Sequence, residues 1–448
     1  MKIRTIRWAA AGIAVGLALA ACATSRLAGN GQQTPAPAGP SSPEAPHADP
    51  APPTPPAHTP MGFTTSGDQR FDDWRDTFAQ KAIASGRRQD VVFQVLDGIV
   101  PVAETVQAQS FDNQAEFVKP IWDYAKSAVS PTRITNGTAK LAANAGVFDS
   151  VESIYAPPRE IVAAIWGMES SYGGFIGNED APRVLASQAA IGRRKDFNES
   201  ELIAIMKLIE DGAATRDQFR KASWAGAIGQ TQFMPSSILT YGRDHDGDGH
   251  KDLWSNAGDA LASAANYLNA FGWKKGQPWA VEAVIPAGFD YSVGDGRKMT
   301  VAAWKALGIN PVMPARFSDV DTLNAELFLP AGSYGPAFLL FDNFYIIKRY
   351  NNADSYALAI GLLADRLAGL PDLTRPWPTD VQMLTQQQAK DLQAGLNKLG
   401  FNAGVVDGII GRGTRGALQK FQAANGLTAD GFPTVAMLTA VQGKATGG

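Results

Sequence analysis

The stretch AAIWGMESSYGG, residues 163–174, places one charged residue, Glu169, among apolar and small neighbours. Pro157 and Pro158 lie just upstream, and proline suits the first turn of a helix because that turn needs no backbone donor there. The glycines at the end of the stretch would stop the helix. A helix is therefore predicted between these limits. Its apolar residues fall on one face together with Glu169: Ile161, Ile165, Met168.

The position of Glu169 on the apolar face predicts a buried carboxylate. Burial disfavours the charged form of a carboxyl group, so we expect the pKa of Glu169 to be raised. A raised pKa suits a proton donor near neutral pH. A glutamate at a frayed helix end, solvated or in a salt bridge, would have the same spacing. The helix alone leaves both interpretations open.

A second segment, SWAGAIGQTQFMPSS at residues 223–237, combines small residues with two glutamines. Glycine and alanine allow a close approach of the backbone, as in the wall of a cleft. The amides of Gln230 and Gln232 can hydrogen-bond a neutral polar ligand such as a sugar. A tight contact between helices would also explain the small residues, but it explains the two glutamines less well.

The composition excludes several classes of function. The chain has 448 residues, 45% hydrophobic and 19% charged, which allows two or three globular domains. Its net charge of -3 gives no basic surplus, so no nucleic-acid partner is expected. Histidine is confined to positions 47, 58, 245 and 250. A zinc enzyme with histidine ligands, or a hydrolase with a histidine base, would have to rely on His245 or His250.

The N-terminus has the plan of a secretion signal. Basic residues precede the apolar run WAAAGIAVGLALAA, which ends at Cys22, the only cysteine. The residues LAAC, 19–22, resemble a bacterial lipobox, which implies removal of residues 1–21 and lipidation of Cys22. Ala23 stands where aspartate retains such proteins at the inner membrane, so the resemblance implies a lipid anchor on the periplasmic face of the outer membrane. A spare thiol is the alternative. With one cysteine, no intramolecular disulfide can form.

The composition changes along the chain and divides it into parts. Residues 22–66 are rich in proline and predict an extended, solvated tether. Residues 67–374 carry helical patterns, with short strand patterns between residues 280 and 340. The fold class is therefore mainly α, with a small sheet attached to the helices. The proline-rich break TRPWPTD, residues 374–380, precedes a unit of three helical stretches at residues 382–443.

The C-terminal unit has a recognisable pattern. The sequence LGFNAGVVDGIIGRGTRGALQKFQAANGL, residues 399–427, resembles the type 1 peptidoglycan-binding domain found at the ends of many cell-wall enzymes. The resemblance implies a wall-binding module. A three-helix bundle without a ligand is the alternative, since a small fold supports many roles.

Two segments together resemble one enzyme family. ESSYG (169–173) and GAIGQTQFMPSS (226–237), followed by RYNNADSYALAIG (349–361), resemble the lytic murein transglycosylases of the membrane-bound type B family. The similarity spans roughly residues 70–370. It implies a lysozyme-like fold, Glu169 as the catalytic acid, and cleft residues that contact the sugar: Ser223, Gln232, Tyr267, Tyr350 and Asn351. Many family members lack the C-terminal unit, which is therefore an added module.

The resemblance also implies a reaction. A lytic transglycosylase cleaves between N-acetylmuramic acid and N-acetylglucosamine, and the muramoyl 6-hydroxyl closes a 1,6-anhydro ring. The substrate then supplies the nucleophile, so one carboxylate, Glu169, acts first as acid and then as base. No cofactor is required. A hydrolytic muramidase, or a wall-binding lipoprotein without catalysis, are the alternatives. The sequence identifies no protein partner.

The segment DHDGDGHKDLW, residues 244–254, resembles the start of an EF-hand calcium loop. Asp244, Asp246 and Asp248 alternate, and His250 would offer its backbone carbonyl. Ser255 stands at the twelfth place, where an EF-hand has a bidentate glutamate. The type B family closes its loop with a later aspartate, which Asp259 would match after an insertion. A structural Ca²⁺ is therefore expected, with a solvated Asp-Gly turn as the alternative.

Overall fold

A computed structural model of the protein describes residues 58–102, 119–192, 194–294, 296–312 and 319–446. The predicted signal sequence, Cys22 and the tether up to residue 57 lie outside the described residues. No helix in the described part is both long and apolar enough to cross a membrane.

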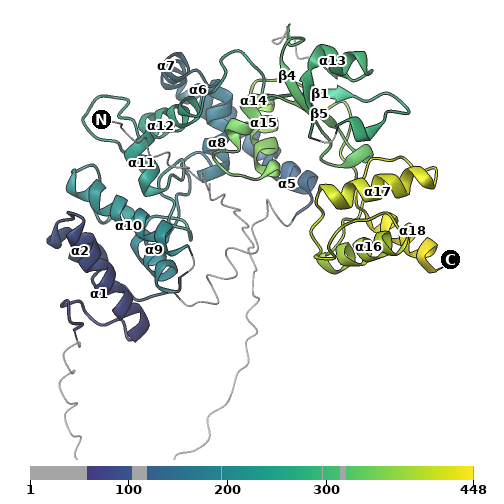
Figure 1. Ribbon diagram of the computed structural model, residues 1–448. Coiled ribbons are helices and arrows are strands. Elements are labelled where there is room, and N and C mark those ends of the chain that lie inside the picture. Colours follow the sequence, from purple (N-terminus) through teal and green to yellow (C-terminus); the bar gives the residue numbers. More distant parts are fainter. Residues whose placement is uncertain (1–57, 103–118, 193, 295, 313–318, 447–448) are drawn as a thin grey trace, which may run out of the picture.

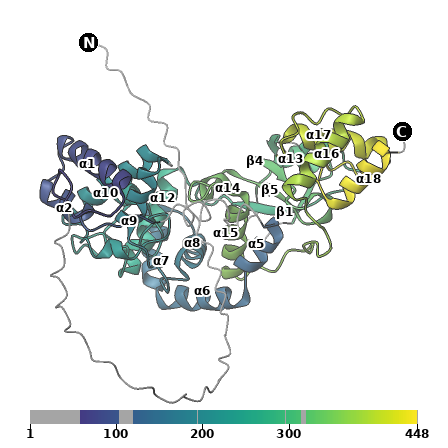
Figure 2. The ribbon, with the colours of Figure 1, turned by 90° about the horizontal axis from the view of Figure 1, so that it is seen from below.

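A body of helices forms the largest part of the molecule and surrounds α8 (Figure 1). Its helices are α1 (Gln69–Ala84), α2 (Gln89–Leu96), α5 (Ile121–Ala128), α6 (Pro131–Ala143), α7 (Ala145–Tyr155), α8 (Arg159–Ser170), α9 (Ala181–Ala190), α10 (Lys195–Glu210), α11 (Pro235–Tyr241), α12 (Ala257–Ala270), α14 (Asp342–Ile347) and α15 (Asp354–Leu367). In Figure 1 and Figure 2, α8 lies beside α15, and the two helices are in close contact.

Helix α8 is buried on every side rather than along one stripe. All of its residues from Ile161 to Ser170 are buried. It contacts α6, α7, α12 and α15. A helix enclosed by four neighbours has no solvent face, so the stripe predicted from its apolar spacing understates its burial. The helix ends where Ser171 and Tyr172 adopt left-handed backbone angles, with φ of 52° and 61°, before Gly173.

A five-stranded antiparallel sheet is inserted between α12 and α14 and has its own core. The strands β1 (Ala280–Val284), β2 (Lys298–Thr300), β3 (Asn310–Val312), β4 (Asn324–Phe328) and β5 (Ala337–Leu340) lie in the order β2-β4-β5-β1-β3. Helix α13 (Val301–Ala306) packs against this sheet, where Trp304 and Phe341 are buried. The small sheet predicted between residues 280 and 340 is therefore confirmed.

The C-terminal unit is a separate helical domain that docks on the sheet (Figure 1). It consists of α16 (Gln386–Lys398), α17 (Arg412–Ala424) and α18 (Val435–Thr446), around a core that includes Leu418 and Phe421. Asp430 accepts hydrogen bonds from the backbone and hydroxyl of Ser333, at 2.8 and 2.6 Å. The ring of Phe432 lies 6.3 Å from that of Tyr334. These contacts give the module a defined orientation.

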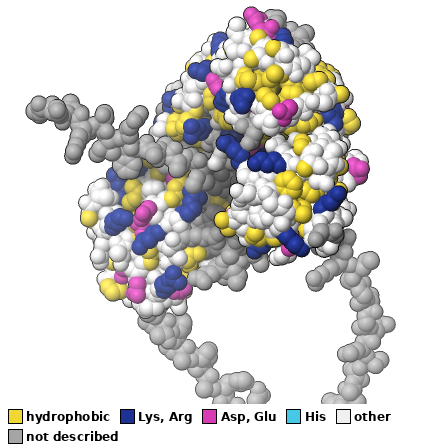
Figure 3. Space-filling view, turned by 45° about the vertical axis from the view of Figure 1, so that its right-hand side comes forward, with side chains coloured by type: hydrophobic (Ala, Val, Ile, Leu, Met, Phe, Trp, Pro, Cys, Tyr) yellow, Lys and Arg dark blue, Asp and Glu magenta, His cyan; other side chains and the backbone are white. Residues whose placement is uncertain are grey.

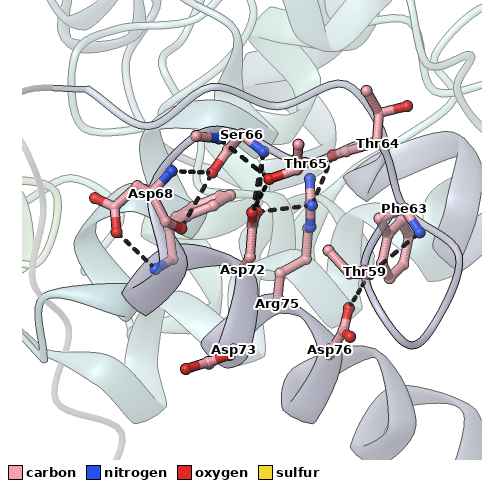
Figure 4. Close-up of polar contacts among 12 residues, drawn as sticks. Thr59, Phe63, Thr64, Thr65, Ser66, Asp68, Asp72, Asp73, Arg75 and Asp76 are labelled. Carbon is pink, nitrogen blue, oxygen red and sulfur yellow. Dashed lines mark hydrogen bonds and ion pairs between the residues drawn. The ribbon is translucent and has the colours of Figure 1, made fainter. Parts of the chain in front are cut away.

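The start of the described chain is fixed to α1 (Figure 4). Asp72 accepts hydrogen bonds from Thr65 and Ser66, and the buried Arg75 donates to the carbonyl of Thr64. Phe63 is fully buried under the guanidinium of Arg75. Residues 58–66, which the proline-rich composition assigned to the tether, therefore belong to the folded body.

Candidate active site

Glu169 lies in the last turn of α8 with only 3% of its surface exposed. The hydroxyl of Tyr356, in the first turn of α15, donates a hydrogen bond of 2.5 Å to its Oε1. Tyr356 is itself 1% exposed. Its burial, and then the charge of Glu169, raise the pKa of the Tyr356 hydroxyl well above its usual value. Tyr356 therefore stays protonated and acts as a donor to the carboxyl group.

The sequence interpretation did not select Tyr356, although the residue lies within RYNNADSYALAIG. A phenol on the buried face of an apolar helix needs a hydrogen-bond partner. This requirement is the feature of the sequence that could have indicated Tyr356, but the sequence does not show which group accepts its hydrogen bond. In the folded chain, α15 places Tyr356 against Glu169, although the two residues are 187 positions apart in the sequence.

The glycine-rich segment forms a tight turn that is tied to α8. The indole of Trp166 on α8 donates to Oε1 of Gln230 at 3.0 Å, so Gln230 links this turn to the helix that carries Glu169. Gly229 has φ of +76°, and a Cβ there would lie 2.7 Å from the carbonyl oxygen of Leu253. Glycine is required at this position because the backbone angle and the close approach both exclude a side chain.

Gln232 has a different role from Gln230. Its backbone adopts φ of 50°, and its Nε2 donates to the carbonyls of Gly229 and Ile176 at 2.8 and 3.2 Å. Its Oε1 is buried without a hydrogen-bond partner among the described residues. A buried acceptor without a partner is unfavourable unless a ligand or water satisfies it. Gln232 is therefore suited to receive a hydroxyl or amide donor.

The predicted cleft residues Ser223, Tyr267, Tyr350 and Asn351 are all buried close to this turn, and three of them hold the backbone. Ser223 accepts from the amides of Ala225 and Ala227. Tyr350 donates to the carbonyl of Thr231 at 2.9 Å, and Tyr267 to that of Arg349 at 2.7 Å. Burial, and then the charge of Glu169, raise the pKa of Tyr350. Asn351 is 1% exposed and follows Tyr350 directly.

Three aromatic rings pack together beneath the turn. The rings of Tyr267 and Tyr350 lie 5.2 Å apart, and Phe233 lies 5.7 Å from the first and 5.8 Å from the second. Because the hydroxyl of Tyr267 is bonded to the backbone, its contribution here is to position Tyr350 and the turn.

A buried carboxylate outside the predicted set fixes the end of the glycine-rich segment. Glu201 on α10 is 2% exposed and accepts from the amide and the hydroxyl of Ser236, at 2.8 and 2.6 Å. Ser236 lies in the first turn of α11, four residues after Gln232. Burial raises the pKa of Glu201, although its bonds with Ser236 oppose this shift. Nothing in the local sequence around Glu201 indicates this contact, because its partner is on another helix.

The acidic loop, residues 244–254 together with Asp259, brings together three of the five ligands predicted for a calcium ion. Carboxylate oxygens of Asp244, Asp246 and Asp259 lie within 4.8 Å of one another. Asp248 lies outside this group and accepts from the amide of His250 at 2.8 Å. An arrangement of three carboxylates whose oxygens converge fits a hard cation such as Ca²⁺. Burial, followed by the charges of Asp246 and Asp244, raises the pKa of Asp259.

Comparison with known proteins identifies the two main parts of the chain. The pattern of the transglycosylase SLT domain matches residues 70–365, and that of the peptidoglycan binding domain matches residues 385–441. The membrane-bound lytic murein transglycosylase B of Escherichia coli (strain K12) is 30% identical over 299 residues, which are 64% of this chain and 77% of that protein.

Solved structures agree with this result. SltB3 from Pseudomonas aeruginosa, in complex with NAG-NAM-pentapeptide, has 41% identity and a TM-score of 0.76, covering 84% of this chain and 100% of that chain. The Escherichia coli lytic transglycosylase Slt35, in complex with calcium, has 26% identity and a TM-score of 0.55, covering 70% of this chain and 96% of that chain. Since the SLT domain accounts for more than half of its length, the protein belongs to the transglycosylase SLT family and is a lytic transglycosylase with a lysozyme-like fold.

Proposed function

We propose that this protein cleaves the bond between N-acetylmuramic acid and N-acetylglucosamine in peptidoglycan and releases 1,6-anhydro-N-acetylmuramic acid, with Glu169 as acid and then base. The hydrogen bond from Tyr356 to the buried Glu169 carries this proposal. It supports a carboxyl group held in one orientation in surroundings that disfavour its charge. SltB3 from Pseudomonas aeruginosa has been solved with NAG-anhNAM-pentapeptide, a ligand that contains such a product.

In this proposal the two oxygens of Glu169 have different tasks. Oε1 accepts the hydrogen bond from Tyr356, and Oε2 is the oxygen that would carry the proton of the carboxylic acid. Oε2 donates that proton to the glycosidic oxygen as the bond to the anomeric carbon breaks. The carboxylate then accepts the proton of the muramoyl 6-hydroxyl as that oxygen attacks the same carbon. The substrate thus supplies a nucleophile at high effective concentration.

Digestion of purified peptidoglycan with wild type and with Glu169→Gln tests this reaction. The proposal expects soluble fragments with anhydro ends from wild type and none from the variant. Mass spectrometry identifies the ends, because anhydro products are lighter by one water than products of hydrolysis. Reducing ends would show a muramidase. Binding to the insoluble wall without release of fragments would show a wall-binding protein without catalysis.

We infer that the chain is held between membrane and wall. Lipidation of Cys22 on the periplasmic face of the outer membrane would anchor one end, and the C-terminal domain would bind peptidoglycan and raise the local substrate concentration. The name of the Escherichia coli relative describes that protein as membrane-bound. Cys22→Ala is expected to release the protein from membranes into the soluble fraction. An unchanged membrane fraction would contradict the anchor.

We propose that the acidic loop binds a structural Ca²⁺ through Asp244, Asp246 and Asp259. The convergence of their carboxylates supports this site, and the relative Slt35 has been solved with calcium. The backbone carbonyl of His250 and the side chain of Asp248 are the further ligands that the sequence predicts. Bound calcium would offset the repulsion among these carboxylates. Calorimetric titration tests this, and no heat of binding at millimolar Ca²⁺ would refute it.

A further inference from the structure

A large cavity whose lining does not include Glu169 lies between the helical body, the sheet and the linker to the C-terminal domain. Its volume is about 780 Å³. Four large aromatic side chains contribute to its wall, from α5, the residue before β1, β5 and the linker: Trp122, Trp279, Phe338, Trp377. A cavity of this size with an aromatic lining and some polar groups has the properties of a ligand site.

The linker forms one wall of this cavity and is held in place. The carboxylate of Glu282 on β1 accepts hydrogen bonds from the backbone amides of Thr374 and Arg375, at 2.8 and 2.9 Å. The ring of Trp377 lies 6.3 Å from that of Phe338. A passive spacer needs neither a tryptophan nor hydrogen bonds to the body. The segment TRPWPTD is therefore part of a built surface.

The opposite wall is rigid before any ligand binds. The indole of Trp279 donates to Asp365 on α15 at 3.1 Å. A Cβ on Gly361 would lie 2.3 Å from the ring of Trp279, so only glycine lets this ring pack against α15. A preformed wall reduces the entropy lost on binding.

The rim of the cavity carries charges of both signs. Asp123 and Lys126 are exposed one turn apart on α5, and neither side chain makes a hydrogen bond or ion pair with another described residue. Arg366 and Asp372 also line it and pair with each other at 3.2 Å. The face in Figure 3 carries both basic and acidic side chains. This charge pattern fits a short zwitterionic chain better than a polyanion or a neutral sugar.

We propose that this cavity binds the stem peptide of the peptidoglycan strand that is cleaved at Glu169. The stem carries free carboxylates and the ammonium of a diamino acid, which match Lys126 and Asp123, while its methyl groups and peptide planes pack on the tryptophans. The inference rests on the proposed function, because it assumes peptidoglycan as the substrate.

Helix α15 sets the path that the stem would take between Glu169 and the cavity. Tyr356 contacts Glu169, and Asp365 lines the cavity nine residues further along the same helix. Nine helical residues span about 14 Å, and a fully extended pentapeptide reaches about 17 Å. Nine residues also turn the helix through about two and a half turns, so Asp365 lies on the face of α15 opposite Tyr356, and the stem would pass both along and around this helix.

Binding measurements with the full chain test the proposal. Glu169→Gln serves as the background so that the ligand is not consumed. The two ligands are the disaccharide of N-acetylglucosamine and N-acetylmuramic acid with a pentapeptide, and the same disaccharide without it. We expect Lys126→Ala and Trp377→Ala each to weaken binding of the peptide-bearing ligand about tenfold and to leave the peptide-free ligand unchanged. Lys275→Ala, an exposed lysine outside the cavity, serves as the control.

The possible results separate this inference from the proposed function. Unchanged binding of the peptide-bearing ligand by both variants would overturn it. Equal loss for both ligands would show a sugar subsite instead and would also overturn it. If wild type releases no fragments from peptidoglycan, the proposed function fails, whatever the binding data show. If wild type releases fragments but neither variant weakens binding, only the stem-peptide site fails.

Discussion

Glu169 and Asp244 show two ways in which this protein holds an acidic side chain. Glu169 is almost fully buried, and its hydrogen-bond donor, Tyr356, lies 187 residues further along the chain. Asp244 accepts from the amides of Gly247 and Gly249, at 2.7 and 2.8 Å, within its own loop. These backbone bonds lower the pKa of Asp244. Tertiary packing organises the first carboxyl group, and local chain geometry organises the second.

The difference between these two environments predicts which substitutions reduce activity and which change only stability. A carboxyl group in a buried, preorganised site contributes through its exact orientation and its protonation state. A carboxylate in an exposed loop contributes little by itself, unless a cation binds there. Four predictions, from the largest expected effect to the smallest, test this contrast.

The largest effect is expected from removal of the proton donor. Glu169→Gln should lower kcat about 1,000-fold, since general acid and base catalysis are both lost. Release of soluble fragments from peptidoglycan measures this loss, and the unfolding temperature shows whether the fold is intact. Glu160→Gln, in the first turn of the same helix, is the matched control and should retain activity. A Glu169→Gln variant with kcat within tenfold of wild type would exclude this role.

Removal of the hydroxyl that orients Glu169 should have the next largest effect. Tyr356→Phe keeps the ring but deletes the donor to Oε1, and we expect kcat to fall about tenfold to a hundredfold. The same assay measures it. Tyr345→Phe, eleven residues earlier in the chain, deletes a hydroxyl that donates to Glu326 on the sheet rather than to Glu169, and should leave kcat unchanged. Equal kcat values for both variants and wild type would show that Tyr356 does not orient Glu169.

Glu201 provides a pH-dependent test of a buried carboxyl group. Its pKa is raised in the folded protein, so the folded state holds this proton more tightly than the unfolded state. The stabilisation is complete below the ordinary carboxyl pKa and is lost as pH rises through the raised value. Between these two pKa values, the unfolding free energy of wild type should fall by up to about 1.4 kcal/mol per pH unit relative to that of Glu201→Gln.

Urea unfolding of both proteins at a series of pH values from 4 to 8 measures this difference. A difference that does not change with pH would show that Glu201 titrates normally. Glu152→Gln, at a partly exposed glutamate on α7, serves as the control for loss of a carboxylate.

The smallest effect is expected at the acidic loop. Ca²⁺ at ten times its Kd should raise the unfolding free energy of wild type by about 1.4 kcal/mol, and Asp259→Asn should remove this gain. Activity should change little, because the proposed ion has no part in the reaction. Thermal unfolding with and without Ca²⁺ is the measurement. An equal Ca²⁺ response in both proteins would exclude Asp259 as a ligand.

Much of the organisation was predictable because it depends on local patterns. Apolar spacing and the glycines after Tyr172 indicated the helix that carries Glu169, and strand patterns indicated the sheet. The motif resemblance indicated the family, which the SLT domain match confirms. The end of the tether was less predictable. Composition marks where proline becomes rare, but the burial of Phe63 and the bonds to Asp72 decide where folding begins.

The sequence by itself determined the helical class, the small sheet, the family and the identity of Glu169 as its candidate acid. Only the tertiary structure decided that Tyr356 orients this carboxyl group, that Gln230 holds the turn to α8 while Gln232 keeps a buried acceptor, and that the linker builds a cavity wall. The reason is physical: helical spacing and turn chemistry act over a few residues, whereas hydrogen-bond partners and burial depend on segments that meet only after the chain has folded.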